Sequence, residues 1–288
     1  MNTKELLKKV RKIEIKTRKL SNNIFGGEYH SAFKGRGMTF SEVRKYQYGD
    51  DIRTIDWNVT ARYREPYVKV FEEERELTLM LLVDISGSSN FGTRTKLKNE
   101  ILTEIAATLA FSALNNNDKV GLVLFSNKIE LFIAPKKGKI HILRIIRELL
   151  NYESTSLKTN ISKALEFISQ VQKKKAIIFI LSDFIDSDYS KSVQLLSKKH
   201  DLTGVRIFDL FEKELQKSGL LFVNDAETGR KLWINSSSKK VRESYNLSFR
   251  KNADYFKNSF SKNGAGAIAL STDDEYVKTL LNYFKNRA

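Results

Sequence analysis

The sequence predicts an α/β protein built on a doubly wound, mostly parallel sheet, preceded by an N-terminal helix and an irregular, extended N-terminal region. From residue 77 onward, short apolar runs alternate with longer segments of helical periodicity, the pattern of strands joined by helical crossovers. The run 176–181 is apolar at every position, as in a strand that helices cover on both faces. With 41% hydrophobic residues and only two prolines among 288, the composition is that of an ordered globular protein.

Three parts of the chain differ in pattern. Residues 1–20 place apolar side chains at helical spacing among lysines and arginines, which indicates an amphipathic N-terminal helix. Residues 21–76 are rich in glycine, arginine and aromatic residues, and glycines separate short extended pieces with no long helix indicated. We expect this second part to be an extension packed on the main domain, which spans residues 77–288.

The main domain contains a regular succession of strands and helices. We predict strands over 77–84, 119–125, 129–133, 176–181, 202–210 and 267–271, and helices over 96–114, 140–150, 161–171, 190–197, 239–261 and 275–286. The stretch 220–234 has the pattern of a hairpin insertion with its turn at 224–229.

The composition excludes several classes of function and of location. The chain has no cysteine, so disulfides, thiolate metal sites and cysteine nucleophiles are excluded. The N-terminal segment lacks the apolar core of a secretory signal. The strongest apolar runs are far shorter than the roughly 20 residues of a membrane helix. We therefore expect a cytoplasmic protein.

The formal net charge of +16 has two interpretations. A polyanion such as nucleic acid or an anionic membrane is one partner that this charge favours. Alternatively, lysines scattered along the whole chain solvate its surface, and no basic cluster alternates with the aromatic residues of a single-strand-binding platform. We favour the second interpretation. The basic face of the N-terminal helix nevertheless suits a peripheral contact with a membrane.

Polar side chains follow two of the buried strands and precede one helix. Asp84, Ser86 and Ser88 occupy alternate positions directly after the first strand, Thr159 precedes the helix at 161, and Asp183 follows the strand that ends at 181. In open α/β sheets, ligands bind beyond the carboxyl ends of the strands. These five residues offer only hard oxygen ligands, which suit Mg²⁺ or Mn²⁺ and not zinc. Because three of the five are neutral hydroxyls, a bound cation would keep an open position for a partner's carboxylate.

Helix capping is the alternative explanation of these residues. Serine and aspartate are common in loops and at helix N-termini. Capping of the following helix is therefore enough to explain either serine of the Asp-x-Ser-x-Ser pattern. The position after a buried strand, together with Thr159 and Asp183 in the expected order, favours a metal site.

Two resemblances to known families extend this interpretation. The segments DISGS, Thr159-Asn160 and Leu181-Ser182-Asp183 resemble the von Willebrand factor A fold and its metal-ion-dependent adhesion site. By that resemblance, the metal ligands are Asp84, Ser86, Ser88, Thr159 and Asp183, with Asp183 often acting through water.

The second resemblance covers about residues 20–288. The stretches GRGMTFSEVRKYQYGDDIRTIDWNVTAR and PYVKVFEEERELTLMLLVDISGS are similar to the bacterial domain of unknown function 58 family. Thr39 and Ser89 depart from the acidic residue and the methionine that many members carry, and neither departure removes a metal ligand. The resemblance implies a functional link to MoxR-type AAA+ ATPases. We therefore expect a metal-dependent protein–protein interaction module that acts as an adaptor for such an ATPase.

The charged residues between 44 and 62 have two interpretations of their own. They form either a docking surface for a partner or an internal salt-bridge network that fastens this region to the main domain. Because buried charges must be paired and the signs alternate, the internal network is favoured. The residues concerned are Arg44, Asp50, Asp51, Arg53, Asp56, Trp57 and Arg62.

Two other classes of function remain as alternatives. A Mg²⁺-dependent phosphoesterase-like enzyme would gather Asp84, Asp183, Asp186 and Asp188 around one metal. No phosphate-binding or nucleophile motif accompanies them, and none of His30, His141 and His200 adjoins the site motifs in sequence. We therefore expect no enzymatic activity. Nucleic-acid binding rests on the charge alone.

Overall fold

The computed structural model describes residues 38–73, 77–93, 96–152, 154–224 and 229–287. The expected N-terminal helix over 1–20 lies outside these residues. The proposed domain boundary at residue 76 stays a prediction, because residues 74–76 also lie outside them.

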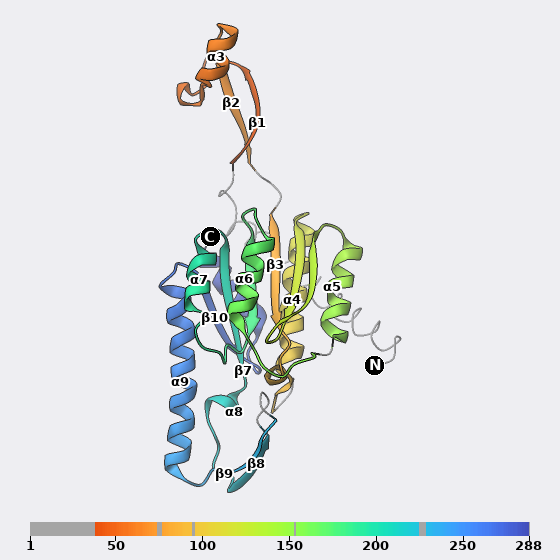
Figure 1. Ribbon diagram of the computed structural model, residues 1–288, viewed down its shortest axis with the longest axis vertical. Helices are drawn as coiled ribbons and strands as arrows, with labels where there is room; N and C mark the ends of the chain where they lie inside the picture. Colours follow the sequence, from red (N-terminus) through yellow and green to blue (C-terminus); the bar gives the residue numbers. More distant parts are fainter. Residues whose placement is uncertain (1–37, 74–76, 94–95, 153, 225–228, 288) are drawn as a thin grey trace.

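A six-stranded sheet forms the centre of the molecule (Figure 1). Its strand order is β10–β7–β6–β3–β4–β5, and every pairing is parallel except that of the edge strand β5 with β4. This confirms the predicted fold class. The strands are β3 (Thr78–Asp84), β4 (Lys119–Phe125), β5 (Ile129–Lys136), β6 (Ile177–Ser182), β7 (Asp201–Phe208) and β10 (Gly266–Ser271).

Helices cover both faces of the sheet. Each buried strand contacts helices on both sides, because its successive side chains point to opposite faces. Leu79, Leu81 and Val83 of β3 pack with one set of helices, while Met80 and Leu82 pack with the other. The first face carries α4 (Lys98–Asn115), α5 (Lys139–Asn151) and α10 (Tyr276–Lys285). The second face carries α6 (Ile161–Val171), α7 (Ser190–Ser197) and α9 (Lys239–Ser261).

The order of the strands creates a switch point in the middle of the sheet. The chain moves from β3 to β4 in one direction and later returns to β6 and β7 on the other side of β3. Crossovers of opposite direction leave a crevice at the carboxyl ends of the two strands where the order reverses. Here those strands are β3 and β6, which end at Asp84 and Ser182.

Two smaller units extend from opposite ends of the α/β body (Figure 1). At one end, β1 (Met38–Lys45) pairs antiparallel with β2 (Tyr67–Glu73), and their connection carries the 3-10 helix η2 (Ile52–Thr54) and α3 (Trp57–Tyr63). At the other end, α8 (Leu210–Lys213) leads into the hairpin of β8 (Leu220–Asn224) and β9 (Lys231–Asn235). The expected hairpin at 220–234 is thereby confirmed.

Two details differ from the sequence-based prediction. The strand expected over 202–210 ends at Phe208, because the Asp209 carboxylate accepts a hydrogen bond from Phe211 N and begins α8. The extended second part contains the short helix α3, which begins where Asp56 accepts hydrogen bonds from Asn58 N and Val59 N. None of the described helices combines the length and apolar character needed to span a bilayer.

A buried histidine makes the stability of this fold depend on pH. His200 lies between α7 and β7 with 3% of its surface exposed, and neither ring nitrogen has a hydrogen-bond partner among the described residues. Burial, assisted by the charge of Lys199, lowers the pKa of His200 to about 4. In an unfolded chain a histidine has a pKa of about 6.5. Below about pH 6.5 the unfolded state therefore binds a proton that the folded state binds only near pH 4.

We expect the free energy of unfolding to fall as the pH is lowered through this window, with His200 accounting for up to about 3 kcal/mol. His200→Phe keeps a ring of similar size and removes the titrating group, so its stability should fall less between pH 6.5 and pH 4.5. Urea unfolding at several pH values measures the difference, with His141→Gln as the control. Parallel pH profiles for wild type and His200→Phe would contradict this account.

Candidate metal site

The segment that follows β3 places three of the five predicted ligands at the switch point. Asp84 ends the strand, and its Oδ1 accepts a hydrogen bond from Ser86 N at 2.9 Å, which turns the chain sharply. The following 3-10 helix η3 (Gly87–Asn90) then brings Ser88 back, so that the Oγ atoms of Ser86 and Ser88 lie 3.1 Å apart. All three residues are buried. Neither serine makes a side-chain hydrogen bond that caps η3, so capping does not explain the pair.

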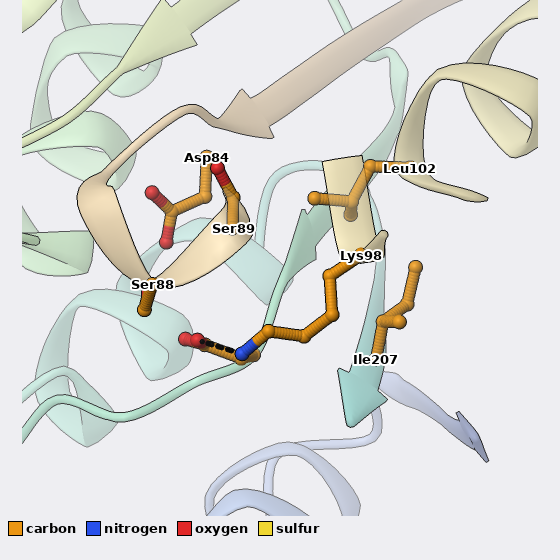
Figure 2. Close-up of a pocket in the computed structure, with 7 residues that line it drawn as sticks. Asp84, Ser88, Ser89, Lys98, Leu102 and Ile207 are labelled. Carbon is orange, nitrogen blue, oxygen red and sulfur yellow. Dashed lines mark hydrogen bonds and ion pairs between the residues drawn. The ribbon is translucent and has the colours of Figure 1, made fainter. Parts of the chain in front are cut away.

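Asp183 joins this group from the neighbouring strand. It directly follows β6, and a small pocket brings it together with Asp84 and Ser88 (Figure 2). Ser182 links the two strand ends, because its Oγ donates to Asp84 Oδ2 at 2.6 Å. The full lining of the pocket is Asp84, Ser88, Ser89, Lys98, Leu102, Asp183 and Ile207.

A backbone contact ties the segment that contains Thr159 to the same loop. Gly87 N donates to Leu157 O at 2.9 Å, which aligns the segment before α6 with the segment after β3. The Thr159 Oγ1 atom is buried and has no hydrogen-bond partner among the described residues. An unpartnered buried hydroxyl is unfavourable unless something else satisfies it.

The site also contains a buried lysine that the sequence analysis did not identify. Lys98 begins α4, and only 1% of its surface is exposed. Its Nζ donates to Asp183 Oδ2 at 2.8 Å and to Glu212 Oε1 of α8 at 2.7 Å. In Figure 2 the dashed line from the labelled Lys98 marks its contact with Asp183. A signal was present in the sequence, since Lys98 shares the helical spacing of the buried Ile101, Leu102 and Ile105.

The ammonium group of Lys98 makes the two carboxylates unequal. Burial disfavours the ionised form of Asp183, but the charge and hydrogen bond of Lys98 outweigh it and hold the pKa of Asp183 below its ordinary value. Burial, together with the nearby charge of Asp183, raises the pKa of Asp84 to about 6. The hydrogen-bond donors to Asp84 among the described residues are neutral: Ser182 Oγ, Ser86 N and the Ser86 hydroxyl. Its negative charge therefore has no cationic partner among the described residues.

These features fit a divalent cation held by oxygen atoms. Two hydroxyls lie within hydrogen-bond distance of each other, a third buried hydroxyl lacks a partner, and a buried carboxylate lacks a counter-charge. Hydroxyl, carboxylate and water oxygens are the ligands that Mg²⁺ and Mn²⁺ accept. The described residues contain no cluster of three or more histidine, cysteine, aspartate or glutamate side chains able to hold a metal, so any cation here depends on the hydroxyls.

The two remaining carboxylates of the enzyme hypothesis are not part of this group. Asp186 Oδ2 accepts a hydrogen bond from Ile161 N at 2.7 Å and so holds the first turn of α6. Asp188 is exposed, with only its backbone carbonyl accepting a hydrogen bond, from Ser162 Oγ. The expected alternative of four aspartates around one metal is therefore wrong for this structure. His141 bonds to Val120 O, and His30 lies outside the described residues.

The ion pairs of Lys98 with Asp183 and Glu212 predict how substitution of this lysine changes stability and the response to Mg²⁺. Lys98→Met leaves Asp183 and Glu212 buried without their counter-ion, which should lower the free energy of unfolding by about 3 kcal/mol or more. Mg²⁺ would then supply the missing positive charge, so its addition should raise the melting temperature of Lys98→Met by more than that of wild type. Differential scanning fluorimetry with and without Mg²⁺ measures both effects.

Lys96→Met is the matched control, because Lys96 pairs with Glu104 in a partly exposed position away from Asp183. An equal response of wild type and Lys98→Met to Mg²⁺ would show that the metal does not replace the ammonium group as a counter-charge.

Comparison with known proteins gives the family of the chain. An uncharacterized protein of Mycobacterium tuberculosis, Rv1480, is 22% identical over 283 residues, covering 96% of this chain and 88% of the relative. Among solved structures, the conserved hypothetical protein BatB from Bacteroides thetaiotaomicron aligns with a TM-score of 0.48 at 12% identity, over 73% of this chain and 98% of BatB. The SpRpn10 VWA domain aligns with a TM-score of 0.39 at 9% identity, over 74% of this chain and 95% of that domain. Residues 42–255 match the family described as "Protein of unknown function DUF58", and the chain belongs to that family.

Proposed function

We propose that this protein is a metal-dependent protein–protein interaction module without catalytic activity. In this proposal, Mg²⁺ or Mn²⁺ is held by Asp84, Ser86, Ser88, Thr159 and Asp183. The cation would supply a positive charge to which an acidic residue of a partner protein coordinates.

The proposal rests on one observation: Asp183 has a cationic partner and Asp84 has none among the described residues. Lys98 already neutralises Asp183, at 2.8 Å from its Oδ2. Asp84 is then the one site carboxylate whose charge remains for the cation, and the serine and threonine ligands carry none. A divalent cation would keep about one uncompensated positive charge in a buried setting, where electrostatic attraction is strong. A carboxylate from outside the chain supplies the missing charge.

The state of Asp183 supports a binding role for this carboxylate. A serine nucleophile requires a general base within hydrogen-bond reach. The described partners of Ser86 Oγ and Ser88 Oγ are each other and the carboxylates. Asp183 is held ionised by Lys98, which makes it a weak proton acceptor. A carboxylate with a lowered pKa serves as a fixed charge better than as a base near neutral pH.

We further propose that the partner is a MoxR-type AAA+ ATPase or a client of that ATPase. This step rests on the resemblance of the GDDIRTIDW and DISGS segments to a family linked with such ATPases. The basic surface of the chain, with a net charge of +16, would favour the approach of an acidic partner.

Binding of the purified ATPase in Mg²⁺ and in EDTA tests the proposal. Asp84→Ala should weaken binding at least about tenfold, since it removes the charge that the cation requires. Ser86→Ala and Thr159→Ala should act in the same direction but less strongly, because each removes a neutral ligand. EDTA should weaken binding without changing the circular dichroism, because apolar residues and not the metal ligands form the hydrophobic core of the sheet.

Asp254→Ala, an exposed carboxylate on α9, is the control and should bind as wild type does. Higher salt should remove nonspecific attraction and preserve the Mg²⁺-dependent component. Equal binding in Mg²⁺ and in EDTA, with the fold intact, would refute the metal-bridged contact. An oligonucleotide that binds in place of the ATPase, with a steep salt dependence, would favour the nucleic-acid alternative.

A further inference from the structure

The unit at the far end of the molecule from the metal site has an unusual surface. We define the head as residues 44–67, which include η2 and α3 and the ends of β1 and β2. In Figure 1 it projects from the α/β body at the end opposite to α8 and the β8–β9 hairpin. The sequence motif GDDIRTIDW lies within it, and the proposed metal-bridged contact makes no use of this motif.

Hydrogen bonds within the head hold its shape. The Arg44 guanidinium forms a bidentate pair with Asp50 at 2.7 and 2.8 Å, and Asp50 also accepts from Gln47 N. The two helical turns begin at Asp51 and Asp56, whose side chains accept backbone hydrogen bonds. The ends of the connection are joined as well, since Asp56 N donates to Tyr67 O at 2.8 Å. A surface built on such fixed turns loses little conformational entropy when it binds.

Large apolar and aromatic side chains point outward from this frame. Tyr48 is fully exposed, and Ile52, Trp57 and Tyr63 each expose more than 60% of their surface. Val68 is the one hydrophobic residue between 42 and 70 that is buried. Single exposed apolar residues are ordinary, but a group of this size on one small unit marks an interaction surface. Tryptophan, tyrosine and arginine are the residues that contribute most to binding at protein interfaces.

The charges of the head are arranged so that only cations remain free. Asp50, Asp51 and Asp56 are engaged in the internal contacts described above, and Asp56 also pairs with Lys69 at 3.5 Å. Glu65 pairs with Lys45. The guanidinium groups of Arg53, Arg62 and Arg64, by contrast, have no hydrogen-bond or ion-pair partner among the described residues, and all three residues are exposed. The described ion pairs of this region join its own residues to one another, as Arg44 with Asp50 and Lys69 with Asp56. The expected network that fastens the region to the main domain is not among the described contacts.

We propose that the head is a second docking surface, which binds an acidic, apolar-lined surface of the protein partner. This inference rests on the proposed function, and it names a second contact with the same ATPase. The three guanidinium groups would face carboxylates of the partner, while Trp57, Ile52 and Tyr63 fill an apolar depression. Two separated contacts on one assembly raise the overall affinity above that of either alone.

The chemistry of the head favours a protein over a nucleic acid. The exposed carboxylates of Asp51 and Glu65 interrupt the free arginines, so the arginines form no continuous basic track. Nucleic-acid surfaces carry cations along a continuous track, with aromatic rings spaced for stacked bases. The head instead exposes aromatic rings together with the aliphatic side chain of Ile52.

Substitutions at exposed positions of the full-length protein test the inference. Trp57→Ser and Arg62→Glu should each weaken ATPase binding at least about tenfold, because each removes a central contact of the surface. The matched control is Ile140→Ser, since Ile140 lies in the first turn of α5 outside the head and is 87% exposed, and this variant should bind as wild type does. The chain has two tryptophans, Trp57 and Trp233. In Trp233→Phe, Trp57 is the sole tryptophan, and its emission should shift to the blue when the ATPase is added.

The outcomes separate this inference from the proposed function. Binding that is lost in Asp84→Ala and EDTA but unchanged in both head variants overturns the head and leaves the metal-bridged contact standing. Binding that is lost in the head variants but unchanged in EDTA supports the head and refutes the metal bridge. Equal losses in Trp57→Ser and Ile140→Ser overturn the inference. So does an absence of ATPase binding by wild type, or weakened oligo(dT) binding by head variants that still bind the ATPase.

Discussion

The buried ammonium group of Lys98 is the interaction on which the polar centre of this molecule depends. It joins three elements that are distant in sequence: the start of α4, Asp183 at the end of β6, and Glu212 on α8. Each of these carboxylates would be unfavourable at its depth without a counter-charge. Because one cation satisfies both, Asp84 is left with hydrogen bonds from neutral donors and an unbalanced charge. The asymmetry between two neighbouring aspartates thus follows from the position of a single lysine.

The topology of the sheet explains why these groups meet. Parallel strands place their carboxyl ends on one edge, and reversal of the strand order at β3 and β6 opens a crevice between two of them. Side chains that follow β3 and β6 therefore converge although they are 98 residues apart, as the Ser182–Asp84 hydrogen bond shows. Lys98 Nζ also donates to Glu212 Oε1. The other carboxylate oxygen of Glu212 accepts a hydrogen bond from Asp209 N at the start of α8. The end of β7 is in this way tied to the same charge network.

Sequence periodicity was sufficient for the strands, the helices and the grouping of Asp84, Ser86, Ser88 and Asp183, because each depends on local pattern and on one rule of sheet topology. It was insufficient for Lys98, because a lysine at the start of a helix is normally solvated and only the tertiary structure shows its burial. The short helix α3 was missed for a similar reason. Its seven residues include β-branched and aromatic side chains, and the hydrogen bonds of Asp56 with two backbone amides decide its conformation.

The two ends of the molecule use the same charged residue types in different environments, buried at the switch point and exposed in the head. At the switch point, charges are buried, so each pair is strongly coupled and removal of one partner is severe. In the head, ion pairs such as Lys45–Glu65 are exposed on both sides, so each contributes little to stability. Their arrangement still matters, because every carboxylate engaged with a neighbouring backbone amide or cation is unavailable to the arginines that remain free. The head thereby presents guanidinium and aromatic groups without their usual internal partners. These groups are therefore available for contact with a partner, whereas the charges at the switch point contact one another.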